Sequence, residues 1–345
     1  MKLDDFRKIF RSSFSEQEEW QQWFFSEVAT DADEVYLSVD RAGNAASALL
    51  MQPYGFLYRG AVLPAAYISC VATLPEARSQ GLASRTMREA LADARRRGYA
   101  MCALIPAEEH LSFFYGRFGF STVFYADRER YTEVHAFGDA TGEIVEASYD
   151  MLHRLEMRNG CGVLHSAQDY AEIVEDMTID GETHVIALAD ADGAEAMLFA
   201  SVGEEAMVKC LIADNKRLAQ AALAELRRRI ADRRITVFGP PLSGDKAFLT
   251  PAGMMRVTDP LKLLSALAAS DARLRVAIRL TDDIIAENTA CYIIADGTCR
   301  RVDAPVKTEL EIDSATLAAI LFGSHRMGAL FGISSHRPYM ALMLD

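Results

Sequence analysis

Excess positive charge, paired cysteines and long apolar runs are all missing from this sequence. The 345-residue chain carries 36 lysine and arginine residues against 49 aspartate and glutamate residues, a formal net charge of −13. Because a phosphate backbone requires a basic protein face, this balance argues against a nucleic-acid-binding protein. It is compatible with a cationic small-molecule substrate, although acidity also serves simply to keep a protein soluble.

The six cysteines are scattered, without a Cys-x-x-Cys pair or any metal-ligand spacing. Several lie within apolar runs, so we interpret them as small core residues with reduced thiols and predict no metal site. No apolar run approaches the roughly 20 residues that span a bilayer. Acidic residues interrupt the first segment, which therefore does not resemble a signal peptide. We expect a cytoplasmic protein with no membrane partner.

A glycine-containing loop connects a predicted strand, residues 65–73, to an amphipathic helix predicted over residues 80–97. The loop matches neither Gly-x-Gly-x-x-Gly nor Gly-x-x-x-x-Gly-Lys-Ser/Thr, which excludes the dinucleotide and P-loop patterns. A helix N-terminus exposes unpaired N–H groups, and small residues let a pyrophosphate approach the backbone closely. Arg78 adds a positive charge there. The sequence therefore predicts an anion site, with an ordinary helix cap as the alternative.

A second segment, residues 144–250, repeats the order strand, helix, strand in a degenerate form. The strand predicted over residues 205–213 leads into a helix and then the strand 235–240, but no glycine-containing loop precedes that helix. From Gly253 the pattern changes to a strand, a helix entered at Asp259-Pro260, three strand-like runs and a short helix. The chain ends in an apolar run, 338–344, which predicts a tail docked into the protein rather than frayed.

The first segment resembles the GNAT superfamily of acetyl-CoA-dependent N-acetyltransferases. The resemblance rests on Arg78-x-x-Gly81-x-Ala83 after the strand, followed one helix and one strand later by Phe-Tyr-Gly-Arg-Phe-Gly-Phe, which contains Tyr115. Over the whole chain the order of segments resembles the enhanced-intracellular-survival (Eis-like) branch of that superfamily. This implies an α/β and α+β fold in three domains. These are a GNAT catalytic domain over residues 1–140, a degenerate GNAT-like domain without a cofactor loop over 141–252, and a sterol-carrier-like α+β domain over 253–345.

The resemblance also implies roles for individual residues in binding acetyl-CoA. The backbone N–H of Val71 would face the thioester oxygen, and the strand edge from Val71 to Thr73 would pair with the pantetheine arm. The pyrophosphate would lie on the loop and first helical turn, which contain Arg78, Ser79, Gln80, Gly81, Leu82, Ala83 and Ser84.

Tyr115 is implied to be the general acid that protonates the departing thiolate, since a phenol is well suited to that donation. The alternative is a tyrosine buried in an aromatic cluster. For the base, the resemblance implies the chain's own terminal carboxylate at Asp345, with a tail that only packs as the alternative. Residues 108–110, Glu-Glu-His, form a second candidate base group.

We therefore predict an N-acetyltransferase that transfers acetyl from acetyl-CoA to a primary amine of a small cationic molecule or a lysine side chain. The alternative is a non-catalytic protein that retains the fold and binds acyl-CoA or an apolar ligand. A lipid-transfer role for residues 254–345 is a third hypothesis. The expected partners are acetyl-CoA and an amine acceptor, without nucleic acid, and the chain could form a homo-oligomer.

Overall fold

The computed structural model of the protein describes residues 1–137, 142–179, 181–230, 232–239, 249–304, 306–323, 326–330, 332 and 338–344. The chain divides into two compact units. Unit 1 contains residues 1–124 and 253–337, and unit 2 contains residues 125–252 and 338–344. Unit 1 thus combines most of the first and third predicted domains, and the three-domain organisation stays a prediction.

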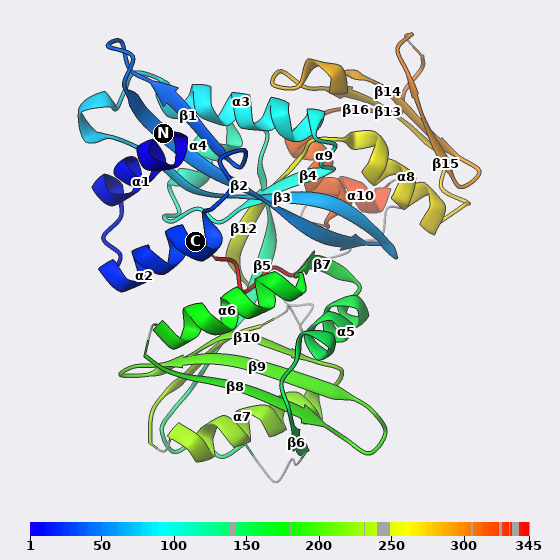
Figure 1. The fold of residues 1–345 in the computed structure, drawn as a ribbon. Coiled ribbons are helices and arrows are strands. Elements are labelled where there is room, and N and C mark those ends of the chain that lie inside the picture. The colour runs from blue at the N-terminus through cyan, green and yellow to red at the C-terminus, as the bar shows by residue number, and fades with distance from the viewer. Residues whose placement is uncertain are drawn as a thin grey trace. The chain divides into compact units, whose positions relative to one another are not determined.

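The main sheet of unit 1 has the strand order β1-β2-β3-β4-β12 (Figure 1). Its first three strands are antiparallel neighbours, β3 and β4 are parallel, and β12 runs antiparallel to β4. The bounds are β1 Val35–Val39, β2 Ala45–Tyr58, β3 Ala61–Thr73, β4 Met101–Leu104 and β12 Leu249–Val257.

Helices cover this sheet because their apolar side chains recur at helical spacing. Helix α3, Leu82–Arg96, buries Met87, Leu91 and neighbouring small residues in the core that it shares with β2 and β3. Helix α1, Lys2–Ser13, contacts β1, β2 and β3. Its Phe10 stacks on Phe24 of the π-helical turn η1, Phe24–Val28, which continues helix α2, Glu18–Trp23.

A second sheet in unit 1 has four strands in the order β15-β14-β13-β16, all antiparallel except for the parallel pair β13–β16. Helix α8, Pro260–Ser270, packs against β14 and β15, and helix α9, Ser314–Leu321, against β13 and β16. The helix entry predicted at Asp259-Pro260 is confirmed, since Asp259 caps α8 by accepting a hydrogen bond from Lys262 N. Asp313 caps α9 by accepting one from Thr316 N. The strand bounds are β13 Val276–Thr281, β14 Ala290–Ala295, β15 Thr298–Val302 and β16 Leu310–Asp313.

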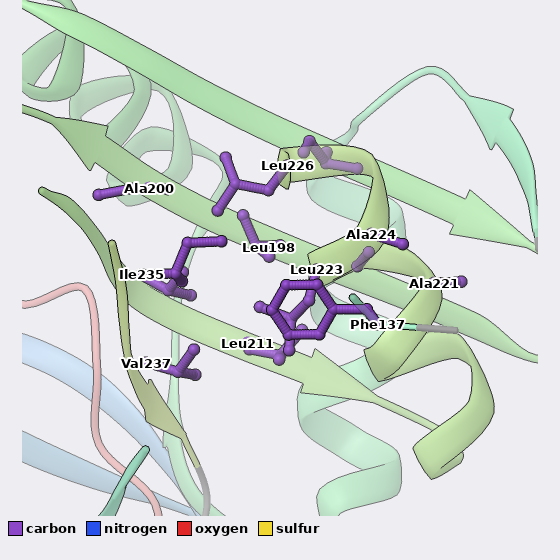
Figure 2. Close-up of a cluster of buried hydrophobic side chains, with 14 of the residues drawn as sticks. Phe137, Leu198, Ala200, Leu211, Ala221, Leu223, Ala224, Leu226, Ile235 and Val237 are labelled. Carbon is purple, nitrogen blue, oxygen red and sulfur yellow. The ribbon is translucent and has the colours of Figure 1, made fainter. Parts of the chain in front are cut away.

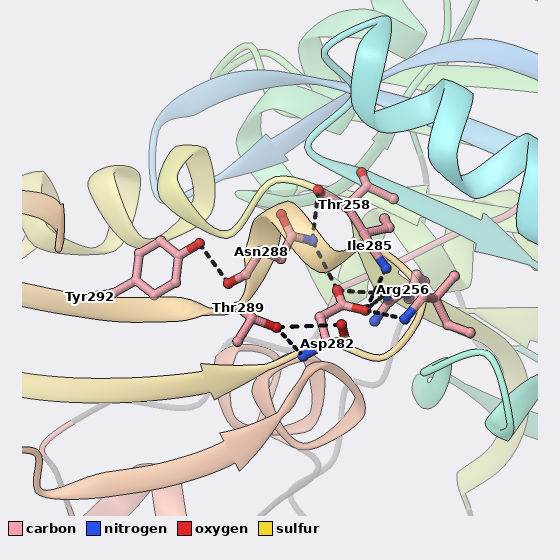
Figure 3. A network of polar contacts seen from close by, with 8 residues as sticks. Arg256, Thr258, Asp282, Ile285, Asn288, Thr289 and Tyr292 are labelled. Atoms are coloured by element: carbon pink, nitrogen blue, oxygen red, sulfur yellow. Dashed lines mark hydrogen bonds and ion pairs between the residues drawn. The ribbon is translucent and has the colours of Figure 1, made fainter. Parts of the chain in front are cut away.

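A buried ion pair joins the two sheets of unit 1. Arg256 of β12 and Asp282, which follows β13, are each 1% exposed at the side chain, and Arg256 Nη2 donates to both carboxylate oxygens, at 2.6 and 2.7 Å. Asn288 Nδ2 donates to the same carboxylate and to the carbonyl of Thr258 (Figure 3). Because several donors share the Asp282 carboxylate, its buried charge is compensated.

Unit 2 is built on a sheet with the order β5-β11-β10-β9-β8-β6, in which only β10 and β11 are parallel. The strands are β5 Ser121–Tyr131, which begins at the end of unit 1, β6 Glu143–Val145, β8 Glu182–Ala189, β9 Glu195–Val202, β10 Ala206–Ala213 and β11 Ile235–Gly239. Helix α7, Lys216–Ile230, covers one face and buries Leu218, Leu223 and Leu226 there (Figure 2). The helix and sheet expected between residues 144 and 250 are thus found.

Side chains along β9 point alternately to the two faces of the unit 2 sheet. Ala196, Leu198 and Ala200 point into the core under α7, so the intervening residues point to the opposite face. There Phe199 contacts Tyr170 of α6 at a ring-centroid distance of 6.5 Å. That face carries α5 Tyr149–Asn159 and α6 Ala167–Ile179, with the short strand β7 Cys161–Leu164 between them in sequence.

Four short elements complete the described helices of unit 1. They are the α-helices α4 Leu111–Gly116 and α10 Met327–Leu330 and the 3₁₀ turns η2 Pro75–Ala77 and η4 Ala286–Asn288. Within the described ranges, no helix has the length and apolarity required to cross a membrane. Every cysteine is a free thiol, and four of the six are buried, as the interpretation of core cysteines predicts.

Candidate active site

A β-bulge interrupts the pairing of β2 with β3. Leu50 pairs with Ser69 and Ala48 pairs with Ala72, so that Leu49 alone faces two residues, Cys70 and Val71. Cys70 has φ of 53°, a left-handed conformation that is uncommon outside glycine. A bulge with this geometry bends its strand and redirects its backbone groups.

Beyond this bend, β3 extends past its parallel neighbour. The pairing of β3 with β4 covers Ala65 to Tyr67, and β4 ends at Leu104, opposite the next residue of β3. Strand β3 continues to Thr73. Among the described residues, β4 offers no partner to this last part of β3, which includes Val71 and Thr73. An extended molecule can pair with such an edge as an added strand.

The loop that follows β3 presents the start of α3 without a side-chain cap. Ser79 and Gly81 both have left-handed backbones, with φ of 62° and 76°. Gly81 is the N-cap residue, and no side chain accepts a hydrogen bond from the first turn of α3. A β-carbon at Gly81 would meet no atom within 4 Å, so its conformation rather than crowding favours glycine.

This loop has the features of an anion site. The first-turn N–H groups of α3 carry the positive end of the helix dipole, and small or exposed residues surround them. Arg78 is exposed, and its Nε donates to the carbonyl of Thr73 at 3.3 Å, which holds the stem of its side chain against the end of β3. The predicted loop residues, Arg78, Ser79, Gln80, Gly81, Leu82, Ala83 and Ser84, are thus adjacent to the free edge of β3.

The corresponding helix of unit 2 begins differently. Asn215 Oδ1 accepts a hydrogen bond from Leu218 N at 2.9 Å and so caps the first turn of α7. A side-chain cap occupies the position that an anion would need. The absence of a glycine loop in the sequence before α7 agrees with this difference.

Tyr115 lies on α4 and is 6% exposed. Its ring contacts Phe114 and Phe120 edge-on, at centroid distances of 5.2 and 6.2 Å. Burial raises the pKa of Tyr115 to about 12, so the phenol stays protonated at neutral pH. Its hydroxyl makes no hydrogen bond with any residue that the structure describes, and it therefore remains available as a donor.

One hydrophobic cluster joins the residues predicted to act together. Tyr115, Ile68 of β3 and Met87 of α3 belong to the same buried core, and Val71 packs against it as a partly buried side chain. The bulge, the first helix after the loop and the tyrosine are therefore parts of one packed region in unit 1. The aromatic-core interpretation of Tyr115 describes its ring, and the catalytic interpretation concerns its hydroxyl.

Of the two candidate base groups, the structure describes only the one at residues 108–110. His110 and Glu108 form an ion pair at 3.2 Å, with side chains that are 69% and 71% exposed, and thus resemble a solvated surface pair. Asp345 lies outside the described residues. No cluster of three or more potential metal ligands occurs among the described residues.

The bulge at Cys70 is a feature of the candidate site that the sequence did not predict. The strand pattern over residues 65–73 continues through Cys70 without a glycine or proline that would mark the bend. Only the register against β2 reveals it.

A strand that extends past its parallel neighbour and leads through a glycine-containing loop to an uncapped helix forms a site suited to a ligand with an extended arm and a phosphate group. Residues 1–123 match the family model described as "Acetyltransferase (GNAT) domain". Residues 1–123 of this chain therefore form an acetyltransferase domain of the GNAT type. No curated protein sequence matches the chain.

Solved structures with the same fold match over nearly the entire chain. A GCN5-related N-acetyltransferase from Kribbella flavida has a TM-score of 0.74 and 19% identity, and the match covers 100% of this chain and 96% of that one. Eis1 from Mycobacterium abscessus has a TM-score of 0.70 and 16% identity, with 96% and 99% covered. A GCN5-related N-acetyltransferase from Anabaena variabilis has a TM-score of 0.77 and 15% identity, with 98% and 96% covered. The fold is thus that of Eis-like, multi-domain GNAT structures.

Proposed function

We propose that this protein transfers the acetyl group of acetyl-CoA to a primary amine, on a small cationic molecule or a lysine side chain. The observation that carries the proposal is the combination of a free edge on β3 with an uncapped helix N-terminus directly after it. An edge of extended backbone suits an amide-containing arm, and the helix N-terminus suits a pyrophosphate. Coenzyme A has both chemical parts in that order.

The residues of the loop fit the phosphate end of acetyl-CoA. Gly81 leaves open space where a side chain would project, and Arg78 is exposed beside it. The uncapped N–H groups of Leu82, Ala83 and Ser84 would donate hydrogen bonds to the phosphate oxygens. Ser79 and Gln80 would complete the loop, and Val71 and Thr73 would pair with the pantetheine arm.

The acetyl donor supplies an activated thioester, and residues of this chain would move the protons. The amine nitrogen forms a bond to the carbonyl carbon while the bond from carbon to sulfur breaks. The N–H of Val71 would donate to the carbonyl oxygen, where negative charge develops. The hydroxyl of Tyr115 would give its proton to the departing sulfur, and its high pKa keeps that proton in place until it is needed.

The proton released by the amine requires a base. We propose the terminal carboxylate of Asp345, whose side chain would place a second carboxylate nearby. Two close carboxylates raise the pKa of at least one of them, which suits a base that works near neutral pH. The apolar residues that precede it are docked, since Met340 and Leu344 are 6% and 3% exposed.

A cationic acceptor is consistent with the net charge of −13, because an acidic protein attracts cations over long distances. The direct test is an acetyl-CoA assay against a panel of polyamines, amino-sugar amines and lysine peptides, with free thiol and acetylated amine measured together. Equal release of both products supports the proposal. Acetyl-CoA binding without any acetylated amine would instead support the alternative, a non-catalytic acyl-CoA-binding protein.

A further inference from the structure

The end of the chain is fastened to unit 2 by backbone hydrogen bonds. Tyr339 N donates to the carbonyl of Cys161 at 3.1 Å, and Val163 N donates to the carbonyl of Tyr339 at 3.0 Å. Together these bonds form a parallel β-bridge between Tyr339 and Gly162. The red end of the chain in Figure 1 accordingly runs beside β7.

Gly162 admits this backbone because it has no side chain. A β-carbon at Gly162 would lie 3.1 Å from Tyr339 N and 3.2 Å from Tyr339 C, and would overlap its carbonyl oxygen. These are backbone atoms that cannot swing away as a flexible side chain can. Any residue larger than glycine would therefore displace the tail or distort β7.

Further contacts hold the same segment at this bridge and after it. The buried hydroxyl of Tyr339 donates to Cys210 Sγ at 3.5 Å. Three residues later the chain turns at Leu342, whose φ of 58° is rare for a side chain of this size and persists only where surrounding contacts impose it. Tyr339, Leu342, Glu156, His165 and Cys210 all line one small cavity, with room for about one water molecule.

His165 and Glu156 form the polar wall of this cavity. Glu156 Oε1 lies 2.6 Å from His165 Nδ1, and its other oxygen accepts a hydrogen bond from His165 N at 3.1 Å. The two side chains are 3% and 8% exposed. A pair this deeply buried is costly to form unless each member is fully hydrogen-bonded.

The imidazole faces charged and polar groups from each element packed around it. Burial lowers the pKa of His165, but Glu156 of α5, Asp169 of α6 and the backbone of Leu342 together raise it above its ordinary value. The charged ring donates from both nitrogens, whereas the neutral ring donates from only one. The charged form can therefore hold Glu156 and the Leu342 carbonyl together. Cys210 and Tyr339 are the other titratable groups at the cavity, and burial raises the pKa of both, so they stay neutral.

We propose that Gly162, Glu156 and His165 form a clasp that fixes residues 338–344 on unit 2 and thereby positions the terminal carboxylate. The terminal carboxylate follows Leu342 by three residues in the sequence, a length of chain that spans at most about 10 Å, so fixing Leu342 limits where the carboxylate can lie. In this role His165 and Glu156 are positioning residues and take no part in the chemistry. The catalytic consequence rests on the proposed function, whereas the clasp itself does not.

Hydrogen exchange of the full-length protein tests the clasp without any assay of activity. In His165→Gln and in Gly162→Ala, amides in the peptide 338–344 should exchange at least 10-fold faster than in the wild type. The matched control is His184→Gln, which removes a histidine paired with Glu182 elsewhere in unit 2. Unchanged exchange in His165→Gln overturns the proposal even if Gly162→Ala fails to fold.

The pH dependence separates positioning from simple packing. As pH rises through the raised pKa of His165, the exchange rate of the tail peptide should increase by more than that of the control peptide 182–189 of β8, which contains no residue of the cavity. His165→Gln should abolish that excess. If the wild type shows no such excess, a charged clasp is wrong.

Steady-state kinetics test whether the clasp affects the proposed reaction. His165→Gln should lower kcat about 10-fold or more and leave the KM for acetyl-CoA nearly unchanged, because the loop after β3 is untouched. A variant with a released tail and full turnover would refute the positioning role. The structural role of the clasp, which is to hold the tail on unit 2, would still stand. A wild type with a protected tail and no activity on any amine would refute the proposed function alone.

Discussion

The guanidinium of Arg256 occupies the space that a β-carbon on Gly119 would fill. Such a carbon would lie 3.0 Å from Arg256 Cζ and 3.3 Å from its Cδ, and would overlap Nη1. Gly119 closes the turn after Tyr115, with Phe118 N donating to the Tyr115 carbonyl and Gly119 N to the Gly116 carbonyl. The turn that carries the proposed general acid therefore rests on the buried ion pair of unit 1.

Gly119→Ala should destabilise the protein and loosen this turn. The methyl group would collide with a guanidinium that is fixed by Asp282, and φ of 80° at Gly119 is unfavourable for alanine. We expect a loss of about 1–3 kcal/mol of unfolding free energy, measured by urea denaturation. Gly116→Ala is the matched control, because a β-carbon at Gly116 meets no atom within 4 Å. Equal stability of the two variants would contradict the close packing of Arg256.

Asp282→Asn should change how stability depends on pH. Burial raises the pKa of Asp282, but Arg256 and neighbouring donors outweigh it and lower the pKa below its ordinary value. The stability that this carboxylate contributes is therefore present above about pH 4 and is lost as pH falls through the lowered pKa. The variant should lose about 3–5 kcal/mol at pH 7, because Arg256 stays buried without its charge partner, and less at pH 3. Parallel urea titrations at the two pH values measure the difference, and an equal loss at both would contradict it.

Gly81→Asp and Gly81→Asn form a matched pair for the anion site. Both side chains have the same shape, and asparagine tolerates the left-handed backbone at this position, so the variants differ mainly in charge. The aspartate variant should bind acetyl-CoA at least 10-fold more weakly than the asparagine variant, because a negative charge would face the pyrophosphate. Calorimetry measures the affinities and gives the stoichiometry, for which we expect one site per chain. Equal affinities would remove this loop from the proposed cofactor site.

Tyr115→Phe should reduce turnover by about 10²–10⁴-fold, the effect of losing one general acid, and leave acetyl-CoA affinity nearly unchanged. Stability should change little, because the Tyr115 hydroxyl makes no hydrogen bond with the described residues. Tyr292→Phe is the opposite control, since that buried hydroxyl donates to the Asn288 carbonyl at 3.0 Å. It should cost about 1 kcal/mol of stability and preserve turnover. Wild-type turnover in Tyr115→Phe would assign this tyrosine to the aromatic core alone.

Extending the C-terminus by three glycines should lower turnover without destabilising the protein. The extension moves the terminal carboxylate by about 10 Å, beyond hydrogen-bond reach of an amine, and leaves the apolar contacts of the tail in place. Asp345→Asn keeps the terminal carboxylate and should do much less harm. Turnover and melting temperature are measured for both variants, and a fully active extended enzyme would refute the catalytic tail.

Local sequence patterns were sufficient for the elements around the cofactor loop. Gly81 followed by an amphipathic run predicted a helix, and the observed α3 begins at Leu82, two residues later than expected, because Gly81 itself adopts the left-handed N-cap conformation. Asp259-Pro260 likewise predicted the start of α8. Caps and amphipathic spacing are interactions between residues a few positions apart, so a single sequence contains all their partners.

The sequence by itself thus determined where helices begin, which loop lacks a cap and which aromatic turn carries Tyr115. The tertiary structure alone decided the bulge at Cys70, the support of Gly119 by Arg256 and the close approach of Tyr339 to Gly162. The residues that contact each other in these three features are separated by 21, 137 and 177 positions in the chain, respectively. Such contacts depend on strand register and on the closure of long loops, and neither leaves a periodic signal near the residues involved.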